Sequence, residues 1–526
     1  MEKTIVKKLG RLCEILHLDC PDNAKDVAIC GITEDSRTAT VGMLFVAVAG
    51  MHVDGHQYIK NAVENGCAAV LVSWDDKGEW AVPVIRVDDT AQTLGFLAAA
   101  FYDFPGNRMT MIGITGTNGK TTSSYLLESV IRESGGAPGV IGTVAVRFHG
   151  HETSASLTTP QPVELQKILW RMKEEGVSHV VMEVSSHALA QHRVNGLLFD
   201  VALFTNISRD HLDFHGSMES YFLAKEKLFC EYLKKDGQGV IVLEGAKEGE
   251  TGWSDRLIGT LSGAGRNYST CGIGAGDVSA EKFHFDLKGI TAEVVLPSGR
   301  IMVQSPLVGE FNLKNIVGVF GCGLALGFAP QSICQGIAVT QGVPGRLERV
   351  VVEEGNLAPR KEEFSVFVDY AHTPDALEKV LQTLRELEPS RLIAVFGCGG
   401  DRDQGKRPLM GNVAGRMADV VLITSDNPRS ESPWKILEEI EKGVRHTNLE
   451  NIEAVRLMET FGGKGYDVIE DRAEAIRVAV SGATKGDVIL ISGKGHECYQ
   501  IIGGKKLVFD DRQQAREQLR KARKAA

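Results

Sequence analysis

The stretch GITGTNGKTT, residues 113–122, contains the residue types that bind phosphate. Gly116 and Gly119 would let backbone amides approach an anion closely, and a helix that starts at Thr121 would add the positive end of its dipole. Lys120 supplies a positive charge, and the Thr121 hydroxyl could reach a nucleotide-bound Mg²⁺. Gly116 precedes Gly119 by only three positions, so the loop is tighter than the usual phosphate loop. An ordinary strand-to-helix turn is the alternative.

Polar residues also follow two apolar runs further along the chain. Residues 177–184 predict a strand with Glu183 near its C-terminal end, and residues 200–205 predict the next strand, which leads to Asp210 and His211. Because open α/β sheets bind ligands at the carboxyl ends of their strands, Glu183 could hold Mg²⁺. A helix cap or a surface ion pair is the alternative for Glu183. His211 lies between two aspartates and could ligate a metal, contact phosphate or be structural.

The last third of the chain contains four polar clusters, each after a short apolar run. The runs alternate with helical stretches, which predicts a parallel, doubly wound sheet. Arg402, Arg429, Asp426 and Glu497 in these clusters would suit a substrate that carries both carboxylates and ammonium groups. The apolar runs are residues 366–369, 392–396, 420–424 and 488–491, and the clusters are residues 369–372, 399–403, 425–429 and 492–497.

The elements that must position these residues are divided by two Pro-Gly turns. The chain has 526 residues, which is too long for one ordinary core. Turns at Pro105 and Pro344 mark the boundaries. The sequence therefore predicts a small N-terminal α/β domain at 1–106, a central domain at 107–343 and a C-terminal domain at 344–526.

Composition limits the classes of function. The chain is 43% hydrophobic and 24% charged, and its net charge of −10 disfavours a general nucleic-acid or membrane-surface binder. Its longest apolar and glycine run, residues 316–329, is too short to span a bilayer, and the N-terminus lacks the apolar core of a secretory signal. The ten cysteines include no C-x-x-C pair. We expect a cytoplasmic α/β protein with reduced, mostly buried cysteines.

Several other positions allow both a functional and an ordinary interpretation. The loops at 33–37 and 50–56 could bind a polar ligand, although solvated turns are the commoner use. Asn312, near a predicted helix start, could reach a purine edge or cap the helix. The periodicity of its helix predicts Lys225 to be a solvated lysine, and residues 512–524 predict a solvated helix.

Taken together, the motifs resemble those of the Mur ligase family, in the family's order and over essentially the whole chain. The resemblance implies three domains: one for the UDP end of a substrate, a central P-loop ATPase-type domain, and a C-terminal Rossmann-like domain for an incoming amino acid. One departure from the family pattern lies at Val242-Leu243-Glu244, where many relatives have an Asn and acidic pair. The matching motifs are residues 116–122, 158–160, 183–187, 210–213, 344–346, 369–372 and 426–429.

The resemblance also implies roles for individual residues. The UDP group would contact Ser36, Met51, His52 and Val53. The muramoyl dipeptide would contact Thr158, Thr159, Ser185, Gln191 and Arg193. ATP would contact Gly116, Thr117, Asn118, Gly119, Lys120, Thr121, Thr122, Asn312, Arg346 and Asp369. Mg²⁺ would be bound by Thr121, Glu183, His211 and Lys225, and the catalytic residues would be Lys120, Glu183, His211 and Lys225.

Lys225 acquires this role because the family carbamylates a lysine in a Tyr-x-x-Ala-Lys setting, which the chain has at this position. A carbamate is an anion with two oxygens, which suits Mg²⁺.

The motif at 426–429 points to meso-diaminopimelate. This amino acid differs from lysine by a distal carboxylate, which Arg429 could bind with two hydrogen bonds. The residues implied for this amino acid are Arg402, Asp426, Asn427, Pro428, Arg429, Gly493 and Glu497.

The activity that the resemblance implies is an ATP-dependent ligation in peptidoglycan precursor synthesis. ATP would phosphorylate the γ-carboxylate of UDP-N-acetylmuramoyl-L-alanyl-D-glutamate, and an amine of diaminopimelate would attack the acyl phosphate. Alternatives are the lysine-adding variant, which Arg429 disfavours, and folylpolyglutamate synthetase, which the N-terminal domain disfavours. A P-loop regulatory ATPase is the alternative from another class. We expect a monomer that binds neither nucleic acid nor membrane.

Overall fold

The computed structural model describes residues 5–50, 53–244, 252–286, 288–340, 342–352, 364–459 and 463–525. It contains two compact units. The first comprises Met1–Glu281, Glu293–Met302 and Lys314–Ile337, and the second comprises Lys282–Ala292, Val303–Leu313 and Ala338–Ala526. No helix among the described residues is long and apolar enough to cross a membrane.

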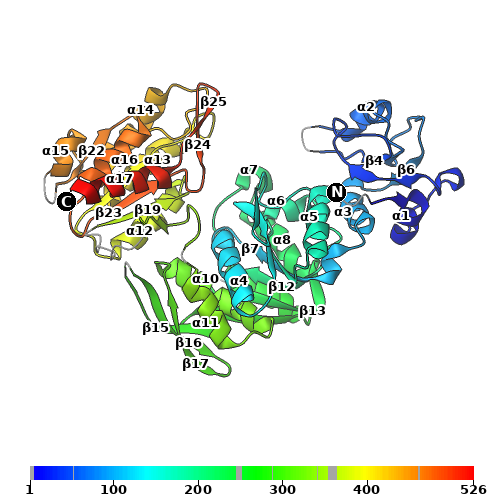
Figure 1. Ribbon diagram of the computed structural model, residues 1–526, viewed down its shortest axis with the longest axis horizontal. Coiled ribbons are helices and arrows are strands. Elements are labelled where there is room, and N and C mark those ends of the chain that lie inside the picture. Colours follow the sequence, from blue (N-terminus) through cyan, green and yellow to red (C-terminus); the bar gives the residue numbers. More distant parts are fainter. Residues whose placement is uncertain are drawn as a thin grey trace. The chain divides into compact units, whose positions relative to one another are not determined.

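The first unit begins with a small parallel sheet, drawn in blue in Figure 1. Its strand order is β3-β4-β5-β6, and all three pairings are parallel. Leu44 and Leu71 of this sheet share one buried cluster with Leu94 and Leu97 of a helix. The elements are β1 (Lys7–Lys8), α1 (Leu9–Leu16), β2 (Ala28–Ile29), β3 (Gly31–Thr33), β4 (Met43–Val46), α2 (Ile59–Glu64), β5 (Ala69–Ser73), β6 (Val84–Val87) and α3 (Thr90–Phe101).

Over the described part of the chain, the central sheet has eleven strands in the order β10-β9-β8-β11-β7-β12-β13-β14-β15-β16-β17. The strands from β8 and β11 through β15 pair in parallel, and β9 and β10 pair antiparallel at one edge. The strands are β7 (Thr110–Thr115), β8 (Pro138–Ile141), β9 (Ala145–Phe148), β10 (His151–Ser154), β11 (His179–Glu183), β12 (Phe199–Phe204), β13 (Leu233–Val242), β14 (Asn267–Ile273), β15 (Val278–Asp286), β16 (Gly289–Leu296) and β17 (Gly299–Ser305).

Helices follow most of the parallel strands of this sheet. Apolar residues of α5, α8 and α9 join those of β11 and β12 in one buried cluster, so these helices cover one face. The helices are α4 (Lys120–Glu133), α5 (Pro162–Glu174), α6 (Ser186–Ala190), α7 (Leu212–His215), α8 (Met218–Cys230), α9 (Trp253–Gly263), α10 (Glu310–Ala325) and α11 (Pro330–Val339).

The C-terminal sheet has the strand order β18-β19-β23-β20-β21-β22, and it is parallel except for β18 at its edge. Alternate residues of each strand enter different cores: Phe367 packs with α12, α13 and α14, whereas Val366 and Val368 pack with α15, α16 and α17. Both faces are therefore covered, and the predicted α/β fold with a doubly wound C-terminal sheet is confirmed.

The strands of this part, together with a two-stranded hairpin, are β18 (Glu348–Arg349), β19 (Ser365–Asp369), β20 (Leu392–Phe396), β21 (Val420–Ile423), β22 (Gly465–Val468), β23 (Val488–Ser492), β24 (Tyr499–Ile502) and β25 (Lys505–Val508). The helices are α12 (Pro374–Arg385), α13 (Lys406–Met417), α14 (Pro433–Val444), α15 (Ala454–Glu459), α16 (Arg472–Ser481) and α17 (Asp511–Ala525). The hairpin β24–β25 is labelled in Figure 1.

Two sequence interpretations need correction. The last helix is not solvated all round, since Ala515 and Leu519 are buried against the sheet. Asn312 lies inside α10, which begins at Glu310, and is therefore not a helix cap.

Candidate active site

The predicted phosphate loop connects β7 to α4. Gly116 has φ +147° and Gly119, the N-cap of α4, has φ +85°. A Cβ atom would lie 2.0 Å from Thr205 Oγ1 at Gly116 and 2.3 Å from Asn315 Oδ1 at Gly119. Only glycine therefore fits at either position, because both the backbone conformation and the surrounding space exclude a side chain. The helix begins at Lys120, one residue earlier than predicted, and its amino end faces the loop.

Two lysine side chains meet at one carbonyl oxygen of this loop. Lys120 Nζ donates to the carbonyl oxygens of Gly116 at 2.8 Å and Thr117 at 2.9 Å. Lys225 Nζ, from α8, donates to the same Gly116 oxygen at 2.9 Å and lies 4.3 Å from the centre of the Tyr221 ring. Burial, reinforced by the charge of Lys120, lowers the pKa of Lys225 well below its usual value. The interpretation of Lys225 as a solvated helix lysine is wrong, because its side chain is buried.

Glu183, the last residue of β11, is buried beside the start of α4. Its Oε2 accepts hydrogen bonds from the hydroxyls of Thr121 at 3.0 Å and Thr143 at 2.9 Å, and its Oε1 accepts one from the Thr143 amide at 3.1 Å. Neither a helix cap nor a surface ion pair describes this carboxylate. No sequence signal marked Thr143, which reaches Glu183 only because β8 and β11 are neighbours.

The oxygens of Glu183, Thr121 and Thr143 are ligands of the kind that Mg²⁺ prefers. Among the described residues, no group of three or more His, Cys, Asp and Glu side chains could hold a metal ion. A cation here would therefore complete its coordination with phosphate oxygens and water, as Mg²⁺ does in nucleotide sites. The oxygen donors fit such an ion.

His211 lies among other histidines. It is the N-cap of α7 with φ +53°, and its side chain is exposed. Its Nε2 is 3.5 Å from Asp210 Oδ2, and its ring centre is 4.7 Å from that of His187. His215, whose ring is 5.4 Å from that of His187, has its pKa lowered to about 4 by burial and by the neighbouring positive groups. The structure places His211 in this cluster, and its predicted metal role stays a prediction.

Four of the five residues predicted to contact the muramoyl dipeptide are linked to one another by hydrogen bonds, and the fifth, Thr158, contacts Thr143. Thr159 Oγ1 donates to the carbonyl oxygen of Glu183 at 2.8 Å and accepts from the Ser185 amide at 3.1 Å. Arg193 donates to the Thr159 carbonyl at 3.1 Å and to Gln191 Oε1 at 2.6 Å. The hydroxyls of Thr158 and Thr143 are 3.1 Å apart. The structure thus brings all five together around the end of β11.

Two of the residues predicted to bind UDP, Ser36 and Val53, lie on loops of the small N-terminal sheet. Ser36 is buried, and its carbonyl oxygen accepts a hydrogen bond from Asn65 Nδ2 at 2.9 Å. The side chain of Val53 is exposed. Met51 and His52 lie outside the described residues.

Asp369 and Arg346 lie together in the second unit. Asp369, at the end of β19, accepts hydrogen bonds from the amides of Leu347 at 2.6 Å and Ala371 at 2.7 Å. Burial raises the pKa of Asp369, although Arg346 and the two amides oppose this effect. The guanidinium of Arg346 lies 4.9 Å from the centre of the Tyr370 ring, and its Nε is buried without a hydrogen-bond partner among the described residues. Asn312 Nδ2 donates to the Val308 carbonyl at 2.8 Å.

The four polar clusters follow β19, β20, β21 and β23, which are neighbours in the sheet and parallel. After β21, Asn427 Nδ2 donates to Glu497 Oε2 at 2.9 Å. Arg429, with φ +55°, donates from Nη1 to the Gly400 carbonyl at 2.6 Å. A Cβ atom at Gly493 would lie 3.0 Å from Asp426 Oδ2. Arg402 is exposed on the loop after β20, and Pro428 lies between Asn427 and Arg429.

Lys494 lies within the polar cluster at 492–497 but was not among the predicted binding residues. Its side chain is fully buried, and its Nζ donates to Asn427 Oδ1 and Glu497 Oε2, both at 3.3 Å. The same nitrogen lies 3.6 Å from Asp426 Oδ1, an atom that has no hydrogen-bond partner among the described residues. One ammonium group therefore balances two carboxylates. Its position after a strand gave a signal, but only the structure showed its burial.

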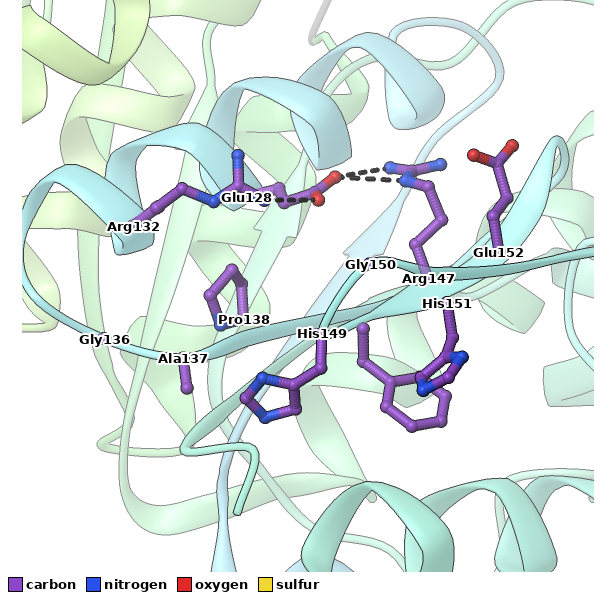
Figure 2. Close-up of a pocket in the computed structure, with 11 residues that line it drawn as sticks. Glu128, Arg132, Gly136, Ala137, Pro138, Arg147, His149, Gly150, His151 and Glu152 are labelled. Atoms are coloured by element: carbon purple, nitrogen blue, oxygen red, sulfur yellow. Dashed lines mark hydrogen bonds and ion pairs between the residues drawn. The ribbon is translucent and has the colours of Figure 1, made fainter. Parts of the chain in front are cut away.

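A separate hollow of about 380 Å³ lies on the first unit (Figure 2). Its lining includes Glu128, which pairs with Arg147 at 2.7 Å and Arg132 at 3.0 Å. The guanidinium of Arg147 also lies 3.8 Å from the centre of the Tyr125 ring. Its lining contains none of the predicted site residues, and both arginines are already paired.

Three segments of the chain match known domains of one family. Residues 28–102 match the Mur ligase family catalytic domain, residues 114–323 match the Mur ligase middle domain, and residues 345–495 match the Mur ligase glutamate ligase domain. The chain belongs to the Mur ligase family. The predicted family is confirmed.

Relatives match nearly the full length of the chain. A UDP-N-acetylmuramoyl-L-alanyl-D-glutamate–2,6-diaminopimelate ligase of Geobacter metallireducens is 43% identical over 511 residues, which are 96% of this chain and 97% of that protein. The ligase of the same name from Geobacillus thermodenitrificans is 40% identical over 498 residues, which are 94% of this chain and 96% of that protein.

Solved structures share the fold. A ligase of that same name is 32% identical, with a TM-score of 0.70 over 98% of this chain and 100% of the other. The MurF ligase of Thermotoga maritima, solved in complex with ADP, is 20% identical, with a TM-score of 0.59 over 94% of this chain and 98% of the other. The second similarity concerns the fold alone.

Proposed function

We propose that the chain is an ATP-dependent ligase that joins meso-diaminopimelate to the D-glutamyl γ-carboxylate of UDP-N-acetylmuramoyl-L-alanyl-D-glutamate. The observation that carries the proposal is the cluster in which Arg429 lies beside the network of Asn427, Lys494 and Glu497. A guanidinium and a carboxylate together match the distal carboxylate and ammonium of this amino acid. Near-full-length relatives that carry the name of this reaction support the same choice.

The first step is transfer of the γ-phosphoryl group of ATP to the substrate carboxylate, which gives an acyl phosphate and ADP. Phosphoryl transfer depends on positioning and charge stabilisation, and Lys120 with the amino end of α4 supplies both. Mg²⁺ bound at Thr121 and Glu183 would neutralise phosphate charge. Thr159, Ser185 and Arg193 would orient the dipeptide carboxylate next to the loop.

Lys225 is proposed to be carbamylated. Because its pKa is lowered, a larger fraction of its side chain is the neutral amine, whose nitrogen can attack CO₂. A C–N bond forms, one C–O π bond opens onto oxygen, and the nitrogen loses a proton. The product is a carbamate anion next to the phosphate loop, in place of a Lys225 ammonium that the charge of Lys120 disfavours. The two carbamate oxygens suit Mg²⁺.

In the second step an amine of diaminopimelate attacks the acyl carbon, and phosphate leaves as the amide forms. Arg429, Asn427 and Glu497 would hold the other end of the amino acid, which fixes the attacking amine.

We also propose the three-domain division at 1–106, 107–343 and 344–526, and action as a monomer. The substrates, ATP and a UDP-linked precursor, place the reaction in the cytoplasm.

An ADP-release assay with the UDP-muramoyl dipeptide and a panel of diamino acids tests the proposal. We expect ADP release only when the dipeptide and meso-diaminopimelate are both present. Equal or faster turnover with lysine would instead indicate the lysine-adding activity. ATP hydrolysis that needs neither substrate would contradict a ligase and favour a regulatory ATPase.

A further inference from the structure

Arg472 begins α16 and Asp511 begins α17, and their side chains form an ion pair that is wholly buried. Nε of Arg472 donates to Oδ1 of Asp511 at 2.7 Å, and Nη2 donates to Oδ2, also at 2.7 Å. The two helices lie side by side on one face of the C-terminal sheet (Figure 1). Burying two charges is costly, so such a pair is weak evidence for a role in stability alone.

The remaining bonds of Arg472 go to two backbone carbonyls at the carboxyl edge of the sheet. Nη2 donates to the carbonyl oxygen of Ser492 at 3.0 Å, and Nη1 donates more weakly to that of Ser425 at 3.4 Å. Ser425 directly precedes Asp426, and Ser492 directly precedes Gly493. One guanidinium therefore joins the starting points of the two loops that carry the proposed diamino-acid residues.

Electrostatics keep this guanidinium charged. Burial opposes the charge, but the carboxylates of Asp511, Asp426 and Glu497 outweigh it and raise the pKa of Arg472. Arg472 thus acts on the same two carboxylates that Lys494 balances. A neutral side chain at this position would leave more negative charge buried beneath the site.

The other side of the loop after β21 is held by the hairpin β24–β25. Gln500 Nε2 donates to the Asp426 carbonyl at 2.8 Å, and the Ile501 amide donates to Asn427 Oδ1 at 2.9 Å. The Arg429 amide donates to the Ile501 carbonyl at 2.9 Å. The hairpin fixes the tip of this loop, and β20 pairs with both β21 and β23. Arg472 adds a direct side-chain link between Ser425 and Ser492, the residues that open the two loops.

We propose that the Arg472–Asp511 pair is a positioning element of the diamino-acid site, which fixes the loop after β21 relative to the loop after β23. The inference rests on the proposed function, because it assigns the diamino acid to these loops. Asn427 and Glu497 come from different loops and contact each other at 2.9 Å, so a shift of about 1 Å between the loops would break their geometry. Through Asp511, the C-terminal helix becomes part of the site.

A second buried pair provides a matched control. Arg391 and Asp487 are also buried and bidentate, with contacts of 2.6 Å and 3.2 Å. Arg391 also donates to a backbone carbonyl, that of Gly482, at 3.1 Å. This pair lies at the opposite edge of the same sheet, directly before β20 and β23. It has the same chemistry and burial but lies at the amino ends of β20 and β23, the ends of these strands away from the site loops.

The test compares two double variants, Arg472→Met with Asp511→Leu and Arg391→Met with Asp487→Leu. Apolar residues of similar volume often preserve stability at buried pairs, which separates folding from positioning. The variants Asp511→Asn and Asp487→Asn serve as a second matched pair if either double variant fails to fold. For each protein, thermal unfolding and the KM values for diaminopimelate, ATP and the UDP-muramoyl dipeptide are measured.

We expect the change at Arg472 and Asp511 to raise the KM for diaminopimelate by about ten- to a hundred-fold, with the other two KM values within about two-fold of wild type. The control pair should leave all three KM values near wild type. Equal diaminopimelate KM values in the two variants, or a parallel rise of all three KM values, would overturn the inference alone. Absence of diaminopimelate-dependent ADP release in the wild-type protein would overturn the proposed function and the inference with it.

Discussion

Arg429 offers the sharpest test of substrate choice. One of its five donors is used by the Gly400 carbonyl at 2.6 Å. Its backbone is fixed separately, because its amide donates to Ile501 and its carbonyl accepts from Gly504 at 3.3 Å. Replacement by alanine should therefore remove the guanidinium while the loop keeps its path.

The expected magnitude follows from the bonds that would be lost. A bidentate, charge-assisted pair with the distal carboxylate of diaminopimelate is worth about 3 kcal/mol, which corresponds to roughly a 150-fold loss in kcat/KM. Arg429→Ala retains the strained φ of +55°. Arg429→Gly removes that strain and should be more stable than Arg429→Ala by about 1 kcal/mol, with the same catalytic loss.

The assay is ADP release at saturating ATP and UDP-muramoyl dipeptide, with diaminopimelate or lysine varied. The loss should be confined to diaminopimelate, because lysine has no distal carboxylate to bind. Arg416→Ala is a suitable control. Arg416 lies on α13, which packs on the C-terminal sheet, and its side chain pairs with Glu378 at the surface. A loss of equal size with both amino acids would refute the proposed role of Arg429.

Three further predictions concern other parts of the site. Lys120→Ala should lower diaminopimelate-dependent ADP release by about a thousand-fold or more, and full turnover in this variant would contradict the phosphate-loop assignment. Removing CO₂ and bicarbonate should lower wild-type ADP release and adding bicarbonate should restore it; a Lys225→Met variant that still responded would exclude Lys225 as the carbamylation site. Burial, with Arg346 and Arg512 nearby, lowers the pKa of His496 to about 4. As pH falls, the His496 imidazole is therefore protonated in the unfolded chain before it is protonated in the folded protein. The free energy of unfolding should decrease by about 1–2 kcal/mol between pH 6.5 and 4. Urea unfolding of wild type and His496→Gln should show a smaller decrease in the variant, and identical pH dependence would contradict the shift.

The sequence alone located the phosphate loop and the polar clusters of the C-terminal sheet. These features depend on local patterns: glycines before Lys120, and apolar runs of strand length that end in polar residues. Because parallel strands place their carboxyl ends at one edge of a sheet, the pattern also predicted that Asp369, Asp426 and Glu497 lie at the same edge. The order of the strands required the structure, since nothing local states that β23 lies between β19 and β20.

Burial and partners were decided only by the tertiary structure. Periodicity placed Lys225 on a helix, yet its partner, the Gly116 carbonyl, is 109 residues away in the chain. Thr143 and the Arg472–Asp511 pair gave no distinct local signal for the same reason. A side chain acquires a shifted pKa or a positioning role from the groups packed around it, and packing depends on contacts between segments that are distant in sequence. Local sequence therefore determined which residues could do chemistry, and the packed fold determined the state in which they do it.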